Sequence, residues 1–439
     1  MTGAKRILVL FPDEWDRSMA ARAAPGHEFV FEGFDLFRFP GNARLFTFDL
    51  RRFVDRLARR YARAGLAGIV TSDEQFGPVV AALLGERLGL PHTPLAAVLA
   101  AQHKYHARQA FERELPECNP RFGLIARDFR RRREVPLAFP FYVKPVKAAF
   151  SVLARRVASW DELDRHARFS WLEARIIERL VKPFGDAMRG RPGFDVDPFS
   201  LIAEEVVDGF QVTVNGFARQ GRVTMLGVVD SLMYPGTDQF QRFQYPSCLP
   251  APRQAAAEAV ARRALAAVGF THGMFNVELR LCASTGHAKV IEINPRAAGQ
   301  FYDLFERVDG YNLFDALVAL ETGEEPRVAH REGRDAVAAS FVMRDLAGEG
   351  LSRWPRRGEI AQLRLRHPRA RIMVYPKRGA DLRRELKWLG SYRYAVANLG
   401  ASSPAALAAA YRAIHRDIGF HPRGRLAEPE AATAEAAAD

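Results

Sequence analysis

Glu278 and Glu292 are the residues whose types and spacing most directly predict chemistry in this chain. They lie on two runs of alternating apolar and polar residues, Phe275–Leu281 and Ala288–Asn294, which a Ser-Thr-Gly turn joins into a predicted β-hairpin. Pairing about that turn sets the two glutamates opposite each other on one face of the hairpin. Like charges directly opposite on a sheet destabilise it, so we expect a divalent cation between them. The alternative is a surface hairpin whose polar face only contacts water.

Two asparagines and an arginine extend this candidate site. Asn276 is expected opposite Asn294, and the amide oxygen of Asn294 is a suitable third ligand for Mg²⁺ or Mn²⁺ beside Glu278 and Glu292. Arg296 follows the strand-ending proline, where its planar guanidinium could donate two parallel hydrogen bonds to a phosphate or carboxylate.

A second predicted strand delivers a lysine. Residues Pro140–Pro145 are apolar apart from Lys144, and the final proline ends the strand just where the ammonium group could meet a phosphate. The following run, Val146–Val152, contains no glycine.

Two other segments carry candidate site residues. Thr93–Arg108 is predicted as one helix that begins near a proline and presents Lys104, although a helical lysine is usually only solvated. Leu201–Val214 is predicted as a strand, an Asp-Gly turn and a second strand, for which an ordinary β-hairpin is the alternative.

Taken in chain order, these motifs resemble the ATP-grasp superfamily, whose metal-binding hairpin typically ends in Glu-x-Asn-x-Arg. The resemblance covers about residues 99–325 and implies that ATP and Mg²⁺ (or Mn²⁺) are the cofactors. It assigns the metal ligands to Glu278, Glu292 and Asn294. It assigns nucleotide contacts to Lys104, Lys144, Lys147, Ser151, Glu204, Glu205, Val206, Val207 and Gln211. In that assignment Glu204 to Val207 line the adenine largely through backbone groups, and Gln211 stands where a ribose-binding glutamate is common. The family normally has a glycine-rich loop after the lysine strand, and its backbone N–H groups cover the phosphates. The glycine-free run Val146–Val152 departs from that pattern, so either the side chains of Lys147 and Ser151 take the place of the loop or the loop is stiffer than usual.

The activity implied by the resemblance is an ADP-forming carboxylate–amine ligase that acts through an acyl phosphate, with Arg296 and Lys144 as catalytic residues. One alternative is an ATP-grasp kinase that releases a stable phosphorylated product. Another is a catalytically weak ATP-binding module. The expected partners are a small-molecule carboxylate and an amine, neither of which the sequence names.

The elements around these motifs predict an α/β fold class. Residues 1–98 alternate strands and helices, which favours a small parallel, Rossmann-like pre-ATP-grasp domain, although no Gly-x-Gly-x-x-Gly dinucleotide motif follows its strands. Asp13-Glu14 and Ser72-Asp73-Glu74 follow two of these strands, so they either contact substrate or are solvated loop acids.

The whole chain is therefore predicted to have an N-terminal domain over 1–98 and a two-subdomain ATP-grasp fold over 99–325. A small C-terminal α+β unit over 326–426 resembles those of the biotin-carboxylase-like and amino-acid-ligase branches, and a disordered tail is expected over 427–439.

Composition supports an ordinary globular protein of 439 residues, with 48% hydrophobic and 26% charged residues. The net charge of +13 comes mainly from scattered arginines without a zinc-finger or RNA-binding motif, which argues against nucleic acid as a partner. No run of eighteen apolar residues predicts a membrane helix, and three separated cysteines predict neither a disulfide framework nor a metal site. We expect a cytoplasmic protein; a homodimer is left open.

Overall fold

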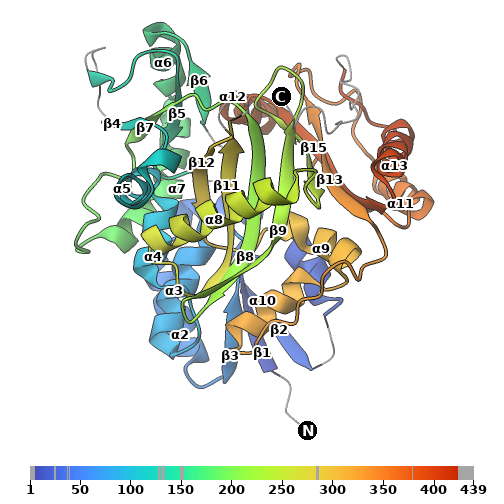
Figure 1. Cartoon of the computed structure of the whole chain (residues 1–439), viewed down its shortest axis with the longest axis horizontal. Coiled ribbons are helices and arrows are strands. Elements are labelled where there is room, and N and C mark those ends of the chain that lie inside the picture. The colour runs from blue at the N-terminus through green and yellow to red at the C-terminus, as the bar shows by residue number, and fades with distance from the viewer. Residues whose placement is uncertain are drawn as a thin grey trace.

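The computed structural model describes residues 5–23, 26–36, 38, 40–126, 129, 134–148, 153–282, 286–377 and 379–423. Three sheets organise these residues (Figure 1). The predicted Ser151 and the predicted tail over 427–439 lie outside the described residues.

The N-terminal part is the predicted small parallel α/β unit. Its three strands, in the order β2-β1-β3, are β1 (Lys5–Leu10), β2 (His27–Glu32) and β3 (Leu66–Val70), and both neighbouring pairs are parallel. Its helices are α1 (Glu14–Ala20), α2 (Leu50–Tyr61) and α3 (Gly77–Leu88). The α2 helix buries Phe53, Val54, Leu57 and Tyr61, which recur at helical spacing along one face.

The single helix predicted over residues 93–108 is wrong. The chain forms α4 (Leu95–Gln102) and α5 (Lys104–Glu114), separated by His103, whose backbone is extended at φ −93° and ψ 97°. The His103 Nδ1 atom accepts a hydrogen bond from the His106 N–H (3.3 Å), and the Lys104 N–H donates to the Val146 carbonyl (2.8 Å). Lys104 therefore begins a new helix, with its main chain fixed to the strand that carries Lys144.

A four-stranded antiparallel sheet follows in the order β4-β7-β5-β6. Its strands are β4 (Phe122–Ile125), β5 (Phe141–Pro145), β6 (Arg155–Val157) and β7 (Leu201–Glu205), and its helices are α6 (Trp160–Ala167) and α7 (Trp171–Met188). Residues 183–198 are rich in glycine and proline, which is typical of a loop, yet α7 continues through Pro183 to Met188. The end of α7 packs Phe184 and Met188 into the core of the N-terminal unit, and this packing outweighs the cost of an internal proline.

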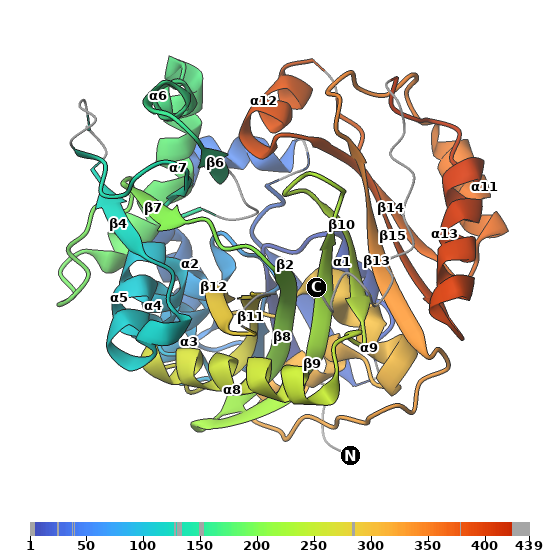
Figure 2. The same ribbon diagram turned by 45° about the horizontal axis from the view of Figure 1, so that its top comes forward.

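The largest sheet has eight strands in the order β12-β11-β8-β9-β10-β13-β15-β14, and its neighbouring strands are antiparallel. The strands are β8 (Phe210–Arg219), β9 (Arg222–Met233), β10 (Phe240–Tyr245), β11 (Gly273–Leu281), β12 (Ala288–Asn294), β13 (Val337–Asp345), β14 (Arg371–Val374) and β15 (Tyr392–Ala401). Its helices are α8 (Ala251–Ala267), α9 (Tyr302–Asp309), α10 (Leu313–Glu321), α11 (Arg357–Arg366), α12 (Gly379–Leu389) and α13 (Pro404–Asp417). The three C-terminal strands thus extend the sheet that carries the β11–β12 hairpin. Figure 2 shows them with α11 and α13 on one side of β8 and β9, and the four-stranded sheet with α6 on the other.

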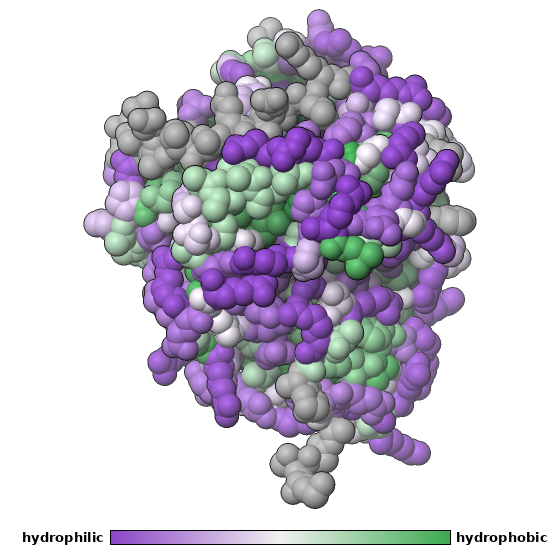
Figure 3. Space-filling view, turned by 90° about the vertical axis from the view of Figure 1, so that its right-hand side faces the viewer, coloured by the Kyte–Doolittle hydropathy of each residue, from purple (hydrophilic) through white to green (hydrophobic). Residues whose placement is uncertain are grey.

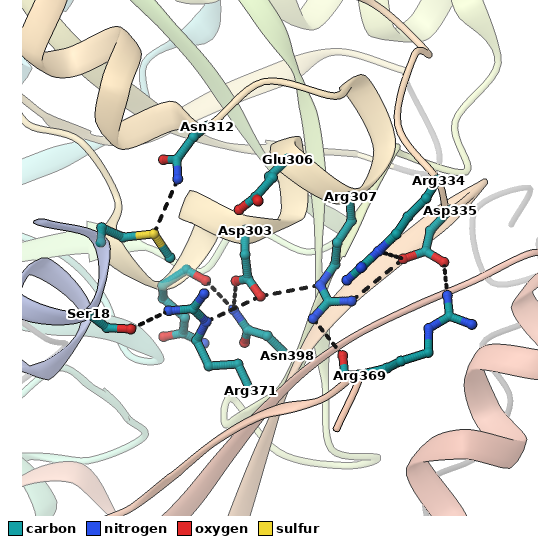
Figure 4. A network of polar contacts seen from close by, with 12 residues as sticks. Ser18, Asp303, Glu306, Arg307, Asn312, Arg334, Asp335, Arg369, Arg371 and Asn398 are labelled. Carbon is teal, nitrogen blue, oxygen red and sulfur yellow. Dashed lines mark hydrogen bonds and ion pairs between the residues drawn. The ribbon is translucent and has the colours of Figure 1, made fainter. Parts of the chain in front are cut away.

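A buried polar network joins the C-terminal strands to the rest of the molecule (Figure 4). Asp303 on α9 accepts a hydrogen bond from Asn398 Nδ2 on β15 (2.5 Å) and pairs with Arg307 Nε (3.2 Å) and Arg371 Nε (3.6 Å). Arg371 on β14 also donates to the Ser18 hydroxyl of α1 (2.7 Å). The network therefore connects the N-terminal unit, α9 and the far edge of the large sheet.

Within the described part of the chain, no helix is both long and apolar enough to cross a bilayer. Hydrophilic side chains cover much of the face that carries α11 and α13, with hydrophobic areas between them (Figure 3).

Candidate active site

The β11–β12 hairpin places its polar residues as the sequence predicts. Glu278 pairs directly with Glu292, and Asn276 pairs with Asn294, so the predicted register is confirmed. The opposite face of β11 buries Val277 and Leu279 against α8 in an apolar core, which fixes the polar face toward the rest of the site.

The two glutamates differ in their electrostatic surroundings. Burial and the facing Glu292 raise the pKa of Glu278 to about 8. Burial also acts to raise the pKa of Glu292, but the Lys104 and Lys144 cations lower it below its ordinary value. A divalent cation would remove the repulsion that keeps Glu278 protonated, so the residues fit the metal that the hairpin predicts.

Asn294 and Gln211 surround Glu278. The Asn294 Nδ2 atom donates to Asn276 Oδ1 (2.9 Å) and to Glu278 Oε1 (3.3 Å), which leaves its carbonyl oxygen as the atom that could ligate a cation. Gln211 Nε2 donates to Glu278 Oε2 (3.0 Å). Among the described residues, no three His, Cys, Asp or Glu side chains gather as a metal site, so the remaining ligands of a cation would be bound phosphate or water.

The predicted nucleotide lysines lie around this pair. Lys104 Nζ is 3.2 Å from Glu292 Oε2 and donates to the Ala148 carbonyl (3.2 Å). Lys147 is buried with its Nζ atom 5.1 Å from the centroid of the Phe184 ring. Burial and the neighbouring Lys104 lower the pKa of Lys147 to about 7. The glycine-free segment thus directs one lysine into the protein interior.

Lys144 belongs to a buried ion cluster with Glu204 and Arg108, of which Arg108 has no predicted role. Glu204 Oε2 lies 2.7 Å from Lys144 Nζ, and Glu204 Oε1 accepts from Arg108 Nε (2.7 Å). Burial acts to raise the pKa of Glu204, but the Arg108 and Lys144 cations lower it to about 2. Arg108 also donates to the carbonyls of Val290 (2.5 Å) and Ile291 (2.8 Å) on β12. Its position four residues after Lys104 was the signal in the sequence.

The segment predicted to line the adenine, residues 204–207, joins two different sheets. β7 pairs with β4 and β5, whereas β8 pairs with β9 and β11, so the alternative of an ordinary hairpin is wrong. The Glu205 N–H donates to the Arg121 carbonyl (2.9 Å), and the Val207 carbonyl accepts from Arg280 Nη1 (2.8 Å). Val206 lies between them, and the adenine contacts of these residues remain a prediction.

Arg296 meets an acid from the N-terminal unit. Its Nη2 atom is 2.5 Å from Glu74 Oε2, and the side chains of both residues are about nine-tenths buried, with 11% and 12% of their surface exposed. Glu74 follows β3, where ligand-contacting residues of parallel sheets are found. The alternative that Glu74 is a solvated loop acid is wrong.

Comparisons with known proteins agree with these motifs. Residues 137–303 match the family described as the ATP-grasp domain. The chain is 31% identical over 314 residues to carnosine synthase 1 of Gallus gallus, an alignment that covers 68% of this chain and 31% of that protein. The chain thus spans about a third of the length of this relative.

Solved structures show the same fold over nearly the whole chain. The L-amino acid ligase of Bacillus licheniformis superimposes with a TM-score of 0.65 and 16% identity, over 97% of this chain and 100% of the other. N5-carboxyaminoimidazole synthase of Aspergillus clavatus, solved with ADP and 5-aminoimidazole ribonucleotide, superimposes with a TM-score of 0.64 and 14% identity, over 95% and 99%. The family match and the motifs within it show that the chain contains an ATP-grasp domain over residues 137–303.

Proposed function

We propose that the chain is an ATP-dependent carboxylate–amine ligase that forms an acyl phosphate and releases ADP and phosphate. One observation carries the proposal: two facing glutamates, the lysines that neutralise them and an arginine gather at one end of a hairpin. The names of the relatives, carnosine synthase and L-amino acid ligase, support a reaction that joins an acid to an amine.

ATP would enter a site whose charges already balance one another. Lys104 and Lys144 contact Glu292 and Glu204, and phosphate groups would compete with those carboxylates for the two ammonium groups. Glu278, Glu292 and Asn294 would hold Mg²⁺ or Mn²⁺, which supplies charge neutralisation for phosphoryl transfer when bound. Glu204 to Val207, largely through backbone groups, and Gln211 would contact the nucleoside, and Lys147 and Ser151 would complete the phosphate contacts.

The chemical step needs positioning and charge stabilisation from the protein. Arg296 would orient the substrate carboxylate toward the transferred phosphoryl group, and Lys144 would stabilise the charge that develops there. The carboxylate then becomes an acyl phosphate, the amine attacks its carbonyl carbon, and phosphate leaves. Lys104 and Glu292 expose only 12% and 22% of their side-chain surface, which favours a site that excludes water from this reactive species.

The proposed substrates, compartment and catalytic unit are those that the sequence predicts. Both substrates would be small molecules bound in the cytoplasm, with residues 99–325 as the catalytic unit and 326–426 as its C-terminal partner. The large sheet crosses the boundary between these units without interruption.

Product analysis tests the proposal. A ligase should release ADP and phosphate in equal amounts only when both an acid and an amine are present. A stable phosphoester would indicate a kinase, and nucleotide binding without any product would indicate a binding module.

A further inference from the structure

We propose that Glu74 and Arg296 together recognise a zwitterionic amino acid as the carboxylate substrate, with Arg296 on its carboxylate and Glu74 on its ammonium group. This inference rests on the proposed ligase function and adds the substrate class. It also gives the N-terminal unit a direct part in the site.

The position of Glu74 is fixed by its neighbours. Asp73 Oδ2 accepts hydrogen bonds from the N–H groups of Phe76 (2.6 Å) and Gly77 (2.7 Å) at the start of α3. Gln102 Nε2, at the end of α4, donates to the Glu74 carbonyl (2.9 Å). The loop is thus held on both sides of Glu74, so its carboxylate is presented to Arg296 from a rigid support.

The Glu74–Arg296 pair is poorly explained as a device for stability. Removing two charges from water is costly, and a buried ion pair generally recovers that cost only when its other hydrogen-bonding groups are satisfied. Within the described part of the chain, the buried Nε atom of Arg296 has no hydrogen-bond partner. A bound carboxylate would supply the missing acceptor for Arg296, since a guanidinium can donate to two oxygens at once.

The charge of the pair selects the class of ligand. An arginine alone would favour any anion, but Arg296 beside Glu74 forms a neutral pair that a simple anion would leave unbalanced. A bound zwitterion would replace the single Glu74–Arg296 ion pair by two ion pairs. One would join its carboxylate to Arg296, and the other would join its ammonium group to Glu74. Lys104, Lys147 and Glu278 also lie within electrostatic reach of Glu74, which places the pair beside the proposed phosphoryl-transfer site.

The test compares amino acids with the same acids lacking the amino group. Each of the twenty common L-amino acids and its 2-deamino analogue is supplied with MgATP and hydroxylamine, and hydroxamate and ADP are measured. We expect the wild-type protein to prefer at least one amino acid over its analogue. Glu74→Gln should lower that preference, measured as the ratio of kcat/KM values, by roughly 10- to 100-fold, because it removes a charge-assisted hydrogen bond.

Two variants accompany Glu74→Gln. Glu74→Asp keeps the charge and should retain part of the preference, which a merely structural role would not predict. Glu86→Gln changes an exposed glutamate of α3 and should leave the ratio unchanged.

The outcomes separate this inference from the proposed function. Equal use of amino acids and their analogues by the wild-type protein, or an unchanged ratio in Glu74→Gln, would overturn the inference while the ligase activity stands. Absence of ADP with every acid would instead overturn the proposed function, and the inference with it.

Discussion

At the scale of single residues, the two facing glutamates are not equivalent. From the sequence, either would serve equally to hold a cation. In the structure Lys104 lies beside Glu292, whereas Glu278 has amide donors from Gln211 and Asn294 and a pKa of about 8. The repulsion between the two carboxylates therefore raises the pKa of Glu278, whereas the pKa of Glu292 lies below its ordinary value.

This asymmetry predicts a pH-dependent stability. The ordinary pKa of 4.5 is raised to about 8 in the folded protein, so the folded state holds a proton that the unfolded chain has released. Stability without metal should therefore fall as pH rises between these values. Glu278→Gln should raise the melting temperature in EDTA, by more at about pH 8.5 than at about pH 6, and should abolish stabilisation by Mg²⁺.

The contrasting variant is Glu292→Gln, which leaves Lys104 without its carboxylate and should not stabilise the protein. Thermal melting across this pH range checks both expectations. Equal effects of the two variants, or normal ADP formation in either of them, would remove the metal-site assignment.

The lysines allow a second prediction at this scale. Lys144→Ala removes a fixed charge aimed at the phosphates and should reduce turnover on the order of 10²-fold or more. Steady-state ADP formation measures this effect beside Lys147→Ala. A larger loss at Lys147 would mean that the buried lysine of the glycine-free segment is the main phosphate contact.

At the scale of elements, Arg108 ties together three segments that the chain brings in from far apart. It lies on α5, pairs with Glu204 on β7 and donates to two carbonyls of β12 immediately before Glu292. The Arg108 side chain thus holds two strands at a fixed distance. One is β7, whose Glu204 contacts Lys144, and the other is β12, which carries Glu292.

Removing Arg108 should therefore be costly. Arg108→Met leaves Glu204 with one cation and leaves buried carbonyls without their donor, so we expect a loss of about 3–5 kcal/mol in the free energy of unfolding. Urea denaturation measures this loss, and Arg113→Met, at an exposed position of the same helix, is the matched control. A loss below about 1 kcal/mol would show that the cluster is not a structural link.

Local patterns account for what could be predicted at this scale. The pairing of Glu278 with Glu292 follows from alternation about a short turn, and the N-terminal strands follow from apolar runs ended by polar residues. The break at His103 depends on a tertiary bond from Lys104 to Val146, which no local pattern contains. β15 is rich in alanine and interrupted by asparagine and glycine, so its strand character comes from pairing with β13 and β14.

The candidate site likewise contains residues that local patterns could predict and contacts that they could not. Residues on the hairpin could be found because its two strands are adjacent in the chain. The contacts of Glu74 with Arg296 and of Arg108 with Glu204 could not be predicted, since each joins residues more than ninety positions apart in the chain.

At the scale of the whole molecule, the C-terminal segment is part of the sheet that carries the site. Asn398 Nδ2 on β15 donates to the Gln300 carbonyl (2.8 Å), and Gln300 Nε2 donates to the Ser340 hydroxyl on β13 (2.7 Å). Gln300 lies four residues after Arg296, so the C-terminal strands support the turn that follows it.

A shortened chain tests this view. Ending the chain at residue 325 would expose the edge of β10 and the apolar residues beneath β13 and β15. We expect aggregation or a loss of cooperative melting, checked by size-exclusion chromatography and calorimetry. A chain ending at residue 423, which keeps every described strand and helix, is the control. A folded, active fragment would contradict the view that the C-terminal strands support the site.

The most direct test of the ligase proposal is to trap its intermediate. Hydroxylamine is a small, strong nucleophile that can take the place of the amine. With a carboxylic acid substrate, MgATP and hydroxylamine, the enzyme should form a hydroxamate and ADP in equal amounts. Formation of AMP and pyrophosphate would instead indicate adenylation, and ADP without hydroxamate would indicate a kinase; either result would contradict the acyl-phosphate mechanism.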